Sequence, residues 1–356
     1  MNNSIAAHIS EDGRIQTVAE HCKMVAKYAA ENGKSINLEA TMRIAGLLHD
    51  IGKNTDEFNT YIKAAHDKQP LSKGKLNHSS AGAKYLNDCI RVTTAKQSLT
   101  LQLISYAIVS HHGLNDCLSL NGDDKYTDRI DPSKDISYEA VVENSKGFID
   151  SNEINSLFSD AVDEIQNVYK KLNMLSKEML INVSDEENNT EYKNNGWYLL
   201  GCLQRIVLSM LMDADRRDTA EFMDNERQYR LEPDETVQLW KNYQRKLDGR
   251  LNSFRGTDRI SKLRKEMSDQ CFSSSCFSDG IYKLSIPTGG GKTYSGFRFA
   301  LEEAIEKKKE HIIYIAPFLS ILEQNAADIK NVFADDFHIL EHHSNMLFDK
   351  IGRAHV

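Results

Sequence analysis

The stretch LLHDIGK, residues 47–53, marks the end of a predicted helix in the first part of this sequence. It closes a helix predicted over about 39–50, whose apolar residues recur with helical spacing and which stops near Gly52. His49 and Asp50 therefore stand together at the end of a buried helix. An isolated His-Asp pair carries little information, so its meaning depends on what the rest of the chain places beside it.

Histidine is concentrated early in the chain, with seven of the twelve histidines in the first 112 residues. Several of them accompany the apolar stripes of predicted helices. These are a helix at 15–31 with His21, one that starts near Asn77 with His78, and one at 99–112 with His111 and His112. Farther along, an apolar helix at 197–213 leads into Asp213 and Asp215. The pattern stays helical to about residue 235, so we expect a mainly α-helical bundle that collects these side chains in its core.

Together these residues have the chemistry of a dinuclear hydrolytic metal site. The candidate ligands are His21, His49, Asp50, His78, His111, His112 and one of Asp213 or Asp215. Two divalent ions about 3.5–4 Å apart activate water and neutralise charge on a phosphoryl group, which suits phosphodiester hydrolysis. Imidazole-rich ligation favours Mn, Co, Ni, Fe or Zn, with Mg as the alternative. His8 and His66 fit no position in this set and are assigned no role.

The periodicity changes near residue 281. Two β-like runs, IYKLSI at 281–286 and HIIYIA at 311–316, alternate with helical stretches at 292–308 and about 319–333. This order predicts a parallel α/β sheet. Because so few strands are found, we expect the N-terminal piece of a larger domain, with an open sheet edge and exposed apolar faces.

A glycine-rich turn, PTGGGKT at 287–293, joins the first β-like run to the following helix. Its three consecutive glycines can cradle phosphates with their backbone N–H groups: Gly289, Gly290 and Gly291. Lys292 would then reach the β- and γ-phosphates of a nucleotide, and Thr293 would ligate Mg²⁺. The turn therefore predicts a site for ATP phosphates.

Composition narrows the class of protein further. The 356 residues carry a net charge of −8, with 40% hydrophobic and 27% charged residues, which argues against a disordered chain. No apolar run approaches the roughly 18 residues of a membrane span, and the start lacks the regions of a signal peptide. Six cysteines without a CxxC pair favour a reducing compartment. We expect a cytoplasmic protein with no membrane partner.

Several stretches together resemble the CRISPR-associated type I helicase-nuclease family. Four stretches resemble the HD-superfamily nuclease domain of that family: LLHDIGK at 47–53, NHSSAGA at 77–83, SHHG at 110–113 and LMDADRRDT at 211–219. Three further stretches resemble the superfamily 2 helicase of that family: PTGGGKT at 287–293, IAPFLSILEQNA at 315–326 and LEHHSN at 340–345. The resemblance implies an HD-superfamily helical bundle at 1–235, a basic helical linker at 236–280, and an incomplete α/β RecA-like segment at 281–356.

The resemblance also implies how the ligands divide between two metals. One metal would be held by His21, His49, Asp50 and Asp215, and the other by His78, His111 and His112, with Asp50 shared. Asp215 is preferred over Asp213 because the ligand in that family lies in an Ala-Asp pair. Lys53 is similar to a family lysine and would contact a substrate phosphate, so Asp50 and Lys53 are the expected catalytic residues.

The function that the resemblance implies is metal-dependent hydrolysis of single-stranded DNA. In full-length relatives the partner is an RNA-guided CRISPR surveillance complex, and ATP with Mg²⁺ serves the helicase. We do not expect ATP hydrolysis from this chain, because a second acidic motif and arginine fingers are missing. The run DDFH at 335–338 is assigned no role, since it follows the phosphate loop too closely and precedes LEHHSN.

Two alternatives stay open. One is an HD phosphohydrolase of small nucleotides, which would have no need of the helicase-like continuation. The other is an inactive fragment that only binds partners, which would have no need of a complete ligand set. The basic stretch at 241–265 is either a solvated helix face or a surface that tracks the phosphates of a single strand.

Overall fold

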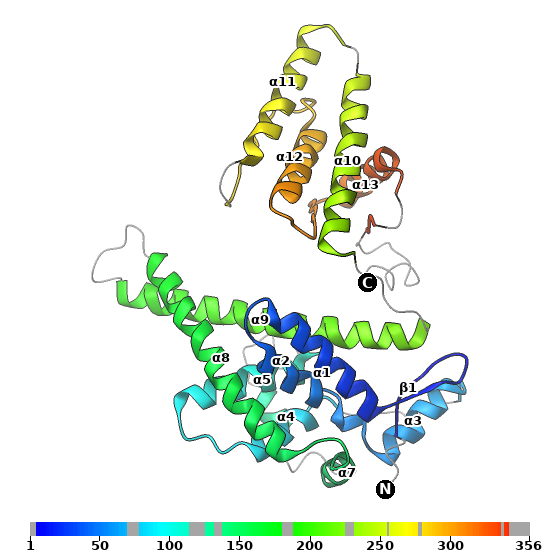
Figure 1. Ribbon diagram of the computed structural model, residues 1–356, viewed down its shortest axis with the longest axis vertical. Coiled ribbons are helices and arrows are strands. Elements are labelled where there is room, and N and C mark those ends of the chain that lie inside the picture. Colours follow the sequence, from blue (N-terminus) through cyan, green and yellow to red (C-terminus); the bar gives the residue numbers. More distant parts are fainter. Residues whose placement is uncertain are drawn as a thin grey trace. The chain divides into compact units, whose positions relative to one another are not determined.

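The chain is mainly helical and divides into two compact units, Met1–Gln228 and Tyr229–Val356. The computed structural model describes residues 5–69, 78–113, 125–131, 137–179, 188–224, 231–254, 256–276, 280–335 and 338–341 (Figure 1). Within these ranges, no helix has both the length and the apolar character that crossing a membrane requires.

The first unit opens with a β-hairpin that leads directly into its first helix. Strands β1 (Ala6–Ile9) and β2 (Ile15–Thr17) pair antiparallel, and helix α1 (Val18–Lys34) follows at once. Thr17 ends the strand and caps the helix, because its hydroxyl accepts from the backbone N–H of Glu20 while the Glu20 carboxylate accepts from that of Thr17. The helix expected over 15–31 therefore begins three residues later than predicted.

The rest of the first unit is a helical bundle. Its elements are α2 (Glu39–Leu48), η1 (Ile51–Lys53), α3 (Asp56–His66), α4 (Ala81–Cys89), α5 (Ala95–Ser110), α6 (Lys125–Ile130), α7 (Tyr138–Ser145), α8 (Ser151–Glu178) and α9 (Asn188–Asp224). Helix α1 packs on α2 and α9, α8 covers α2, and α5 lies between α4 and α9. Figure 1 shows the long α9 passing behind α1 and α2. One continuous apolar core joins these helices.

Two glycines allow the close approaches that bring the ends of helices together. A side chain at Gly82, in the first turn of α4, would collide with the carbonyl oxygen of Leu48 at the end of α2. A side chain at Gly52, in η1, would likewise collide with the backbone carbonyl oxygen of His78. These contacts place the turn after α2 directly beside the segment that precedes α4. His49, Asp50 and His78, three of the candidate ligands, lie at or beside this junction.

The second unit contains four α-helices among its described residues: α10 (Pro233–Ser253), α11 (Arg259–Ser273), α12 (Lys292–Glu306) and α13 (Leu319–Phe333), with a short turn η4 (Ser274–Cys276) after α11. Helices α10 and α11, which lie within the expected basic linker for most of their length, both pack on α12. Helices α10, α12 and α13 contribute the side chains of a small apolar core: Tyr243, Leu247, Leu301, Ile329 and Phe333.

The two β-like runs of the second unit form no strands in the described part of the chain, where the one sheet is β1–β2. In the run at 311–316, Ile312 packs against the small core, but Ile313 and Ile315 are 82% and 85% exposed and are covered by no neighbouring strand of the described residues. A strand persists only when its backbone groups pair with another strand, and an apolar β-branched pattern cannot supply that partner. The parallel sheet expected from these runs is therefore absent from the described residues. His342 and His343 of the LEHHSN motif lie outside them.

Candidate metal centre

The turn after α2 carries the two residues from which the site is built. His49 follows the last residue of α2, and its Nδ1 donates a hydrogen bond to the carbonyl oxygen of Gly46 at 2.8 Å. A carbonyl can only accept, so the proton sits on Nδ1 and leaves Nε2 to face the interior. Asp50 comes next, completely buried between α2 and η1.

His111 repeats the same arrangement at the end of α5. Its Nδ1 donates to the carbonyl oxygen of Ile108 at 2.6 Å, so Nε2 again points inward. That Nε2 atom lies 3.3 Å from Oδ1 of Asp50. Both imidazoles thus emerge from a helix end with their orientation fixed by the carbonyl three residues earlier.

His21 enters from the first turns of α1 and completes the buried set with Asp215 from α9. Nε2 of His21 lies 3.3 Å from Oδ1 of Asp215, 3.4 Å from Oδ2 of Asp50 and 3.2 Å from Nε2 of His49. Nδ1 of His49 donates to Gly46 and Nδ1 of His21 donates to the carboxylate of Asp218, so two Nε2 lone pairs would face each other when both rings are neutral. Only a proton or a metal cation between them relieves that repulsion.

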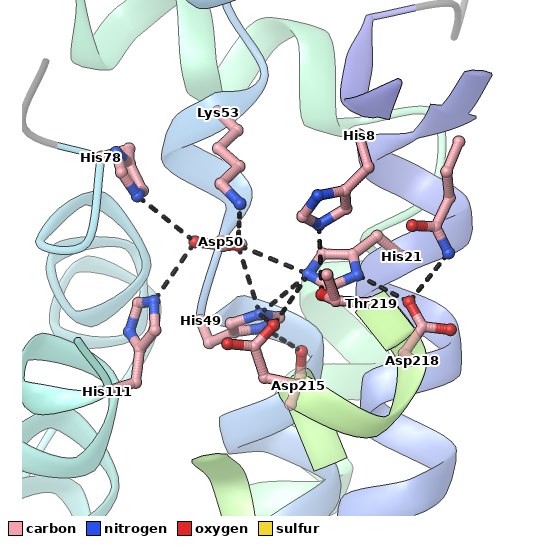
Figure 2. Close-up of polar contacts among 12 residues, drawn as sticks. His8, His21, His49, Asp50, Lys53, His78, His111, Asp215, Asp218 and Thr219 are labelled. Carbon is pink, nitrogen blue, oxygen red and sulfur yellow. Dashed lines mark hydrogen bonds and ion pairs between the residues drawn. The ribbon is translucent and has the colours of Figure 1, made fainter. Parts of the chain in front are cut away.

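The ligand atoms form two groups that share one carboxylate. His21, His49, Asp50 and Asp215 offer atoms that all lie within 4.8 Å of one another, and so do Asp50, His111 and His112. The two oxygens of Asp50 divide between the groups (Figure 2). Oδ2 lies 3.4 Å from Nε2 of both His21 and His49, whereas Oδ1 faces His111. Asp50 is therefore placed to bridge two cations.

His78 joins the second group from the segment before α4. Its Nε2 lies 2.7 Å from Nε2 of His112 and 3.8 Å from Oδ1 of Asp50. The first group is buried almost throughout, but the side chain of His78 is 20% exposed and His112 lies at the surface. The site is thus most exposed on the side of these two histidines.

The charges in the first group show that it stabilises positive charge. Burial lowers the pKa of His21, but its contacts with Asp215, Asp218 and Asp50 outweigh burial and raise that pKa to about 10. Burial also lowers the pKa of His49, whereas the charge of Asp50 and its contact with Asp215 raise it to about 9. Burial raises the pKa of Asp50, yet Lys53 and His49 hold it well below its usual range. Protons therefore occupy positions where a metal cation would bind.

The residues present fit divalent metal ions. Neither carboxylate oxygen of Asp50, nor Nε2 of His111, makes a hydrogen bond of normal geometry in the described structure, although Nζ of Lys53 lies 2.6 Å from Oδ2. Buried polar atoms without hydrogen bonds are rare and costly unless an ion or water satisfies them. Imidazole nitrogens with carboxylate oxygens are a donor set suited to Mn, Fe, Co, Ni and Zn.

Lys53 lies inside the site. Its ammonium group forms an ion pair with Asp50 and lies 5.7 Å from the ring centre of Phe58. Burial lowers the pKa of Lys53, but the adjacent Asp50 carboxylate outweighs it and raises that pKa, so the side chain stays charged. The structure therefore shows Lys53 buried and paired with the shared carboxylate.

The structure distinguishes the two carboxylates left open by the local pattern. Asp215 faces His21 and His49, whereas Asp213 accepts a hydrogen bond from Nδ2 of Asn32 at 2.9 Å and lies outside both ligand groups. All seven expected ligands, His21, His49, Asp50, His78, His111, His112 and Asp215, lie at one place in the first unit.

Two residues at the site were not identified from the sequence. Asp218 accepts a hydrogen bond from Nδ1 of His21 at 2.7 Å, and its place one helical turn after Asp215 was a usable signal. The ring centre of His8 lies 4.7 Å from that of His21, and its Nε2 is 3.5 Å from the hydroxyl of Thr219. Burial, followed by the charge of His21, lowers the pKa of His8 to about 3, so this ring is neutral. No spacing signal in the sequence connects His8 to the other histidines. His66 lies away from the site, at the surface, where its Nδ1 contacts the carboxylate of Asp67.

The glycine-rich loop of the second unit lies at the start of α12. Gly289 and Gly291 adopt φ of 81° and 86°, a left-handed conformation that side chains other than glycine disfavour. Gly291 precedes Lys292, the first residue of α12, and Nε of Arg264 donates to the carbonyl oxygen of Gly289 at 2.8 Å. Backbone N–H groups at a helix start suit phosphate binding.

Comparison with known protein families finds one match within each of the two units of the chain. Residues 18–136 match the family described as the HD domain, and residues 257–351 match the family described as the Type III restriction enzyme, res subunit. No curated protein matches the chain. The first match contains six of the expected ligands, and Asp215 lies beyond it; the second contains the glycine-rich loop. The chain thus combines an HD domain, characteristic of metal-dependent hydrolases, with a helicase-type region.

Proposed function

We propose that this chain is a dinuclear-metal nuclease that hydrolyses phosphodiester bonds of single-stranded DNA. The observation that carries the proposal is the position of Asp50, whose two oxygens face two separate groups of ligands. When bound there, two divalent ions would supply an activated water and charge neutralisation at a phosphoryl group. One ion would be held by His21, His49 and Asp215. The other ion would be held by His78, His111 and His112. Asp50 would bind both ions.

The surrounding residues support a negatively charged substrate. Lys53 brings a buried positive charge to the shared carboxylate, and metal binding at Asp50 would free its ammonium group to pair with a phosphate oxygen. His78 and His112 lie on the accessible side, so the scissile phosphate would approach between them and Asp50. The neutral ring of His8 packs edge-on against His21.

The choice of single-stranded DNA rests on the second unit. A helicase-type region with a phosphate loop accompanies the HD domain in one chain, which suits a polymer substrate better than a small nucleotide. The basic segment at 241–265 lies in α10 and α11 and offers a surface for backbone phosphates. Within the same proposal, the nuclease acts on foreign DNA in the cytoplasm, after recruitment by an RNA-guided CRISPR surveillance complex.

The proposal is tested by cleavage of circular single-stranded DNA. The full chain is freed of metal and then supplied with Mn²⁺, Co²⁺, Ni²⁺, Zn²⁺ or Mg²⁺, with Asp50→Asn as the inactive variant and Asp213→Asn as the matched control. Metal-dependent cutting that survives in Asp213→Asn and disappears in Asp50→Asn is expected. Turnover of small nucleotides without cutting would instead establish a phosphohydrolase, and inactivity towards both despite bound metal would leave a protein that only binds partners.

A further inference from the structure

The three inward-facing imidazoles differ in what holds them. His49 and His111 donate from Nδ1 to backbone carbonyls, as described above. His21 instead donates to the carboxylate of Asp218, at 2.7 Å. A carboxylate is a charged acceptor and binds the Nδ1 proton about twice as strongly as a neutral carbonyl does. His21 is therefore the more strongly polarised of these ligands.

Asp218 is itself held in place. Its side chain is only 5% exposed, and the same oxygen that accepts from His21 also accepts from Nε2 of Gln16 at 2.8 Å. Gln16 belongs to β2, and the neighbouring hairpin residue Arg14 donates to the backbone oxygen of Phe222 near the end of α9. The hairpin and α9 thus hold the carboxylate from two sides.

Helix α9 supplies both a ligand and its support. Asp215 and Asp218 are three residues apart and so lie on one face of the helix, one beside Nε2 of His21 and the other beside Nδ1. Any displacement of α9 would move the ligand and the support together. This arrangement fits a role in positioning His21 rather than in contacting substrate.

We propose that Asp218 is a positioning residue that sets the metal affinity of the buried ligand group, by holding His21 with Nδ1 protonated and Nε2 directed at the metal. The inference rests on the metal centre of the proposed function. A carboxylate behind a ligating imidazole fixes the tautomer and raises the basicity of the ligand nitrogen. Gln16 keeps the Asp218 oxygen aimed at His21 and acts one step farther out.

The test measures Mn²⁺ affinity of the full chain from the EPR signal of the free ion. Asp218→Asn keeps the shape of the side chain and removes its charge, so we expect binding at the buried group to weaken about 10- to 100-fold. Glu221→Gln is the matched control: it removes one charge from the same helix, and Glu221 accepts from the hydroxyl of Tyr28 at 2.6 Å instead of from a ligand. Its affinity should stay within about twofold of the original.

A folded Asp218→Asn protein with unchanged Mn²⁺ affinity would overturn the inference and leave the nuclease proposal intact. Failure of the unaltered protein to bind Mn²⁺ would instead defeat the metal centre itself. If Asp218→Asn proves unfolded by circular dichroism, Gln16→Met decides, with weaker binding expected and unchanged binding contradictory. Nitrogen-15 spectra of the Zn²⁺-loaded protein should show His21 protonated at Nδ1, and a proton on Nε2 would also overturn the inference.

Discussion

Nε2 of His111 lies 3.3 Å from Oδ1 of Asp50, and neither atom makes a hydrogen bond of normal geometry in the described structure. Both atoms are buried, so each has lost its water without gaining a hydrogen bond. The other oxygen of Asp50 faces His21 and His49. One carboxylate thus joins both halves of the site, and the consequences of removing it are specific.

Asp50→Asn should abolish tight metal binding in both ligand groups. The amide keeps the volume of the side chain but loses the charge that both groups share. We also expect the metal-free protein to lose about 3–5 kcal/mol of stability, because Lys53 would be left as a buried charge without its partner. Isothermal titration with Mn²⁺ and urea unfolding would measure the two effects. Retention of one tightly bound ion would contradict the bridging role of Asp50.

Lys53→Met should destabilise the protein more without metal than with it. Without metal, the substitution leaves the buried Asp50 carboxylate short of a positive partner, at a cost of about 3 kcal/mol. Bound metal would replace that partner. Lys146→Met is the control, since Lys146 pairs with Glu143 at the surface and should contribute less than about 1 kcal/mol. Thermal unfolding with EDTA and with Mn²⁺ would show the difference, and equal losses in both conditions would contradict it.

Gly52→Ala should damage the second ligand group more than the first. The new methyl group would collide with the backbone carbonyl of His78 and push that histidine away from His112. We expect a loss of about 2 kcal/mol in stability and weaker binding of one of two metal ions. Gly201→Ala is the matched control, because Gly201 lies in α9 with open space around it, and it should stabilise the helix by roughly 0.5–1 kcal/mol. Unchanged metal binding in Gly52→Ala would contradict this account.

Metal binding should release protons and strengthen as the pH rises. In the metal-free protein the pKa of His21 is about 10 and that of His49 about 9, so both rings are protonated at pH 7 and must lose a proton to bind metal. Affinity for Mn²⁺ should therefore increase from pH 7 to about 9. Calorimetry at pH 7 in buffers of different ionisation enthalpy would count the released protons. Proton-independent binding would contradict the assignment of these two ligands.

The same shifts predict how the stability of the metal-free protein depends on pH. Both pKa values lie above the ordinary histidine value of 6.5, so protonation contributes stability that is fully present below pH 6.5. This contribution is lost as the pH rises through 9 and 10. Urea unfolding in EDTA should show stability falling over that range, and His21→Gln should flatten the dependence. A rise in stability above pH 7 would contradict the sign.

The clustering of most candidate ligands could be predicted from the sequence because these residues have a local signal. His49 and His111 close apolar helices, and such helices end at the core. The choice between Asp213 and Asp215 depends on which face of α9 meets α1, which local spacing alone does not determine. His8 comes from a strand whose position depends on long-range packing, so no periodicity connects it to His21.

The β-like runs of the second unit show the opposite limit. Their composition favours strands, but a strand depends on a partner that composition does not provide. Helices α12 and α13 form as their periodicity predicts, because their hydrogen bonds are internal to each segment. The runs at 281–286 and 311–316 stay unpaired in the described structure, although their composition predicts that both lie in one sheet.

Mn²⁺ loading followed by EPR tests most directly whether Asp50 joins two metal ions in one centre. We predict two tightly bound ions per chain with the spectrum of a spin-coupled pair, and loss of that spectrum in Asp50→Asn but not in Asp213→Asn. A single bound ion, or two ions without coupling, would contradict the bridging role of Asp50.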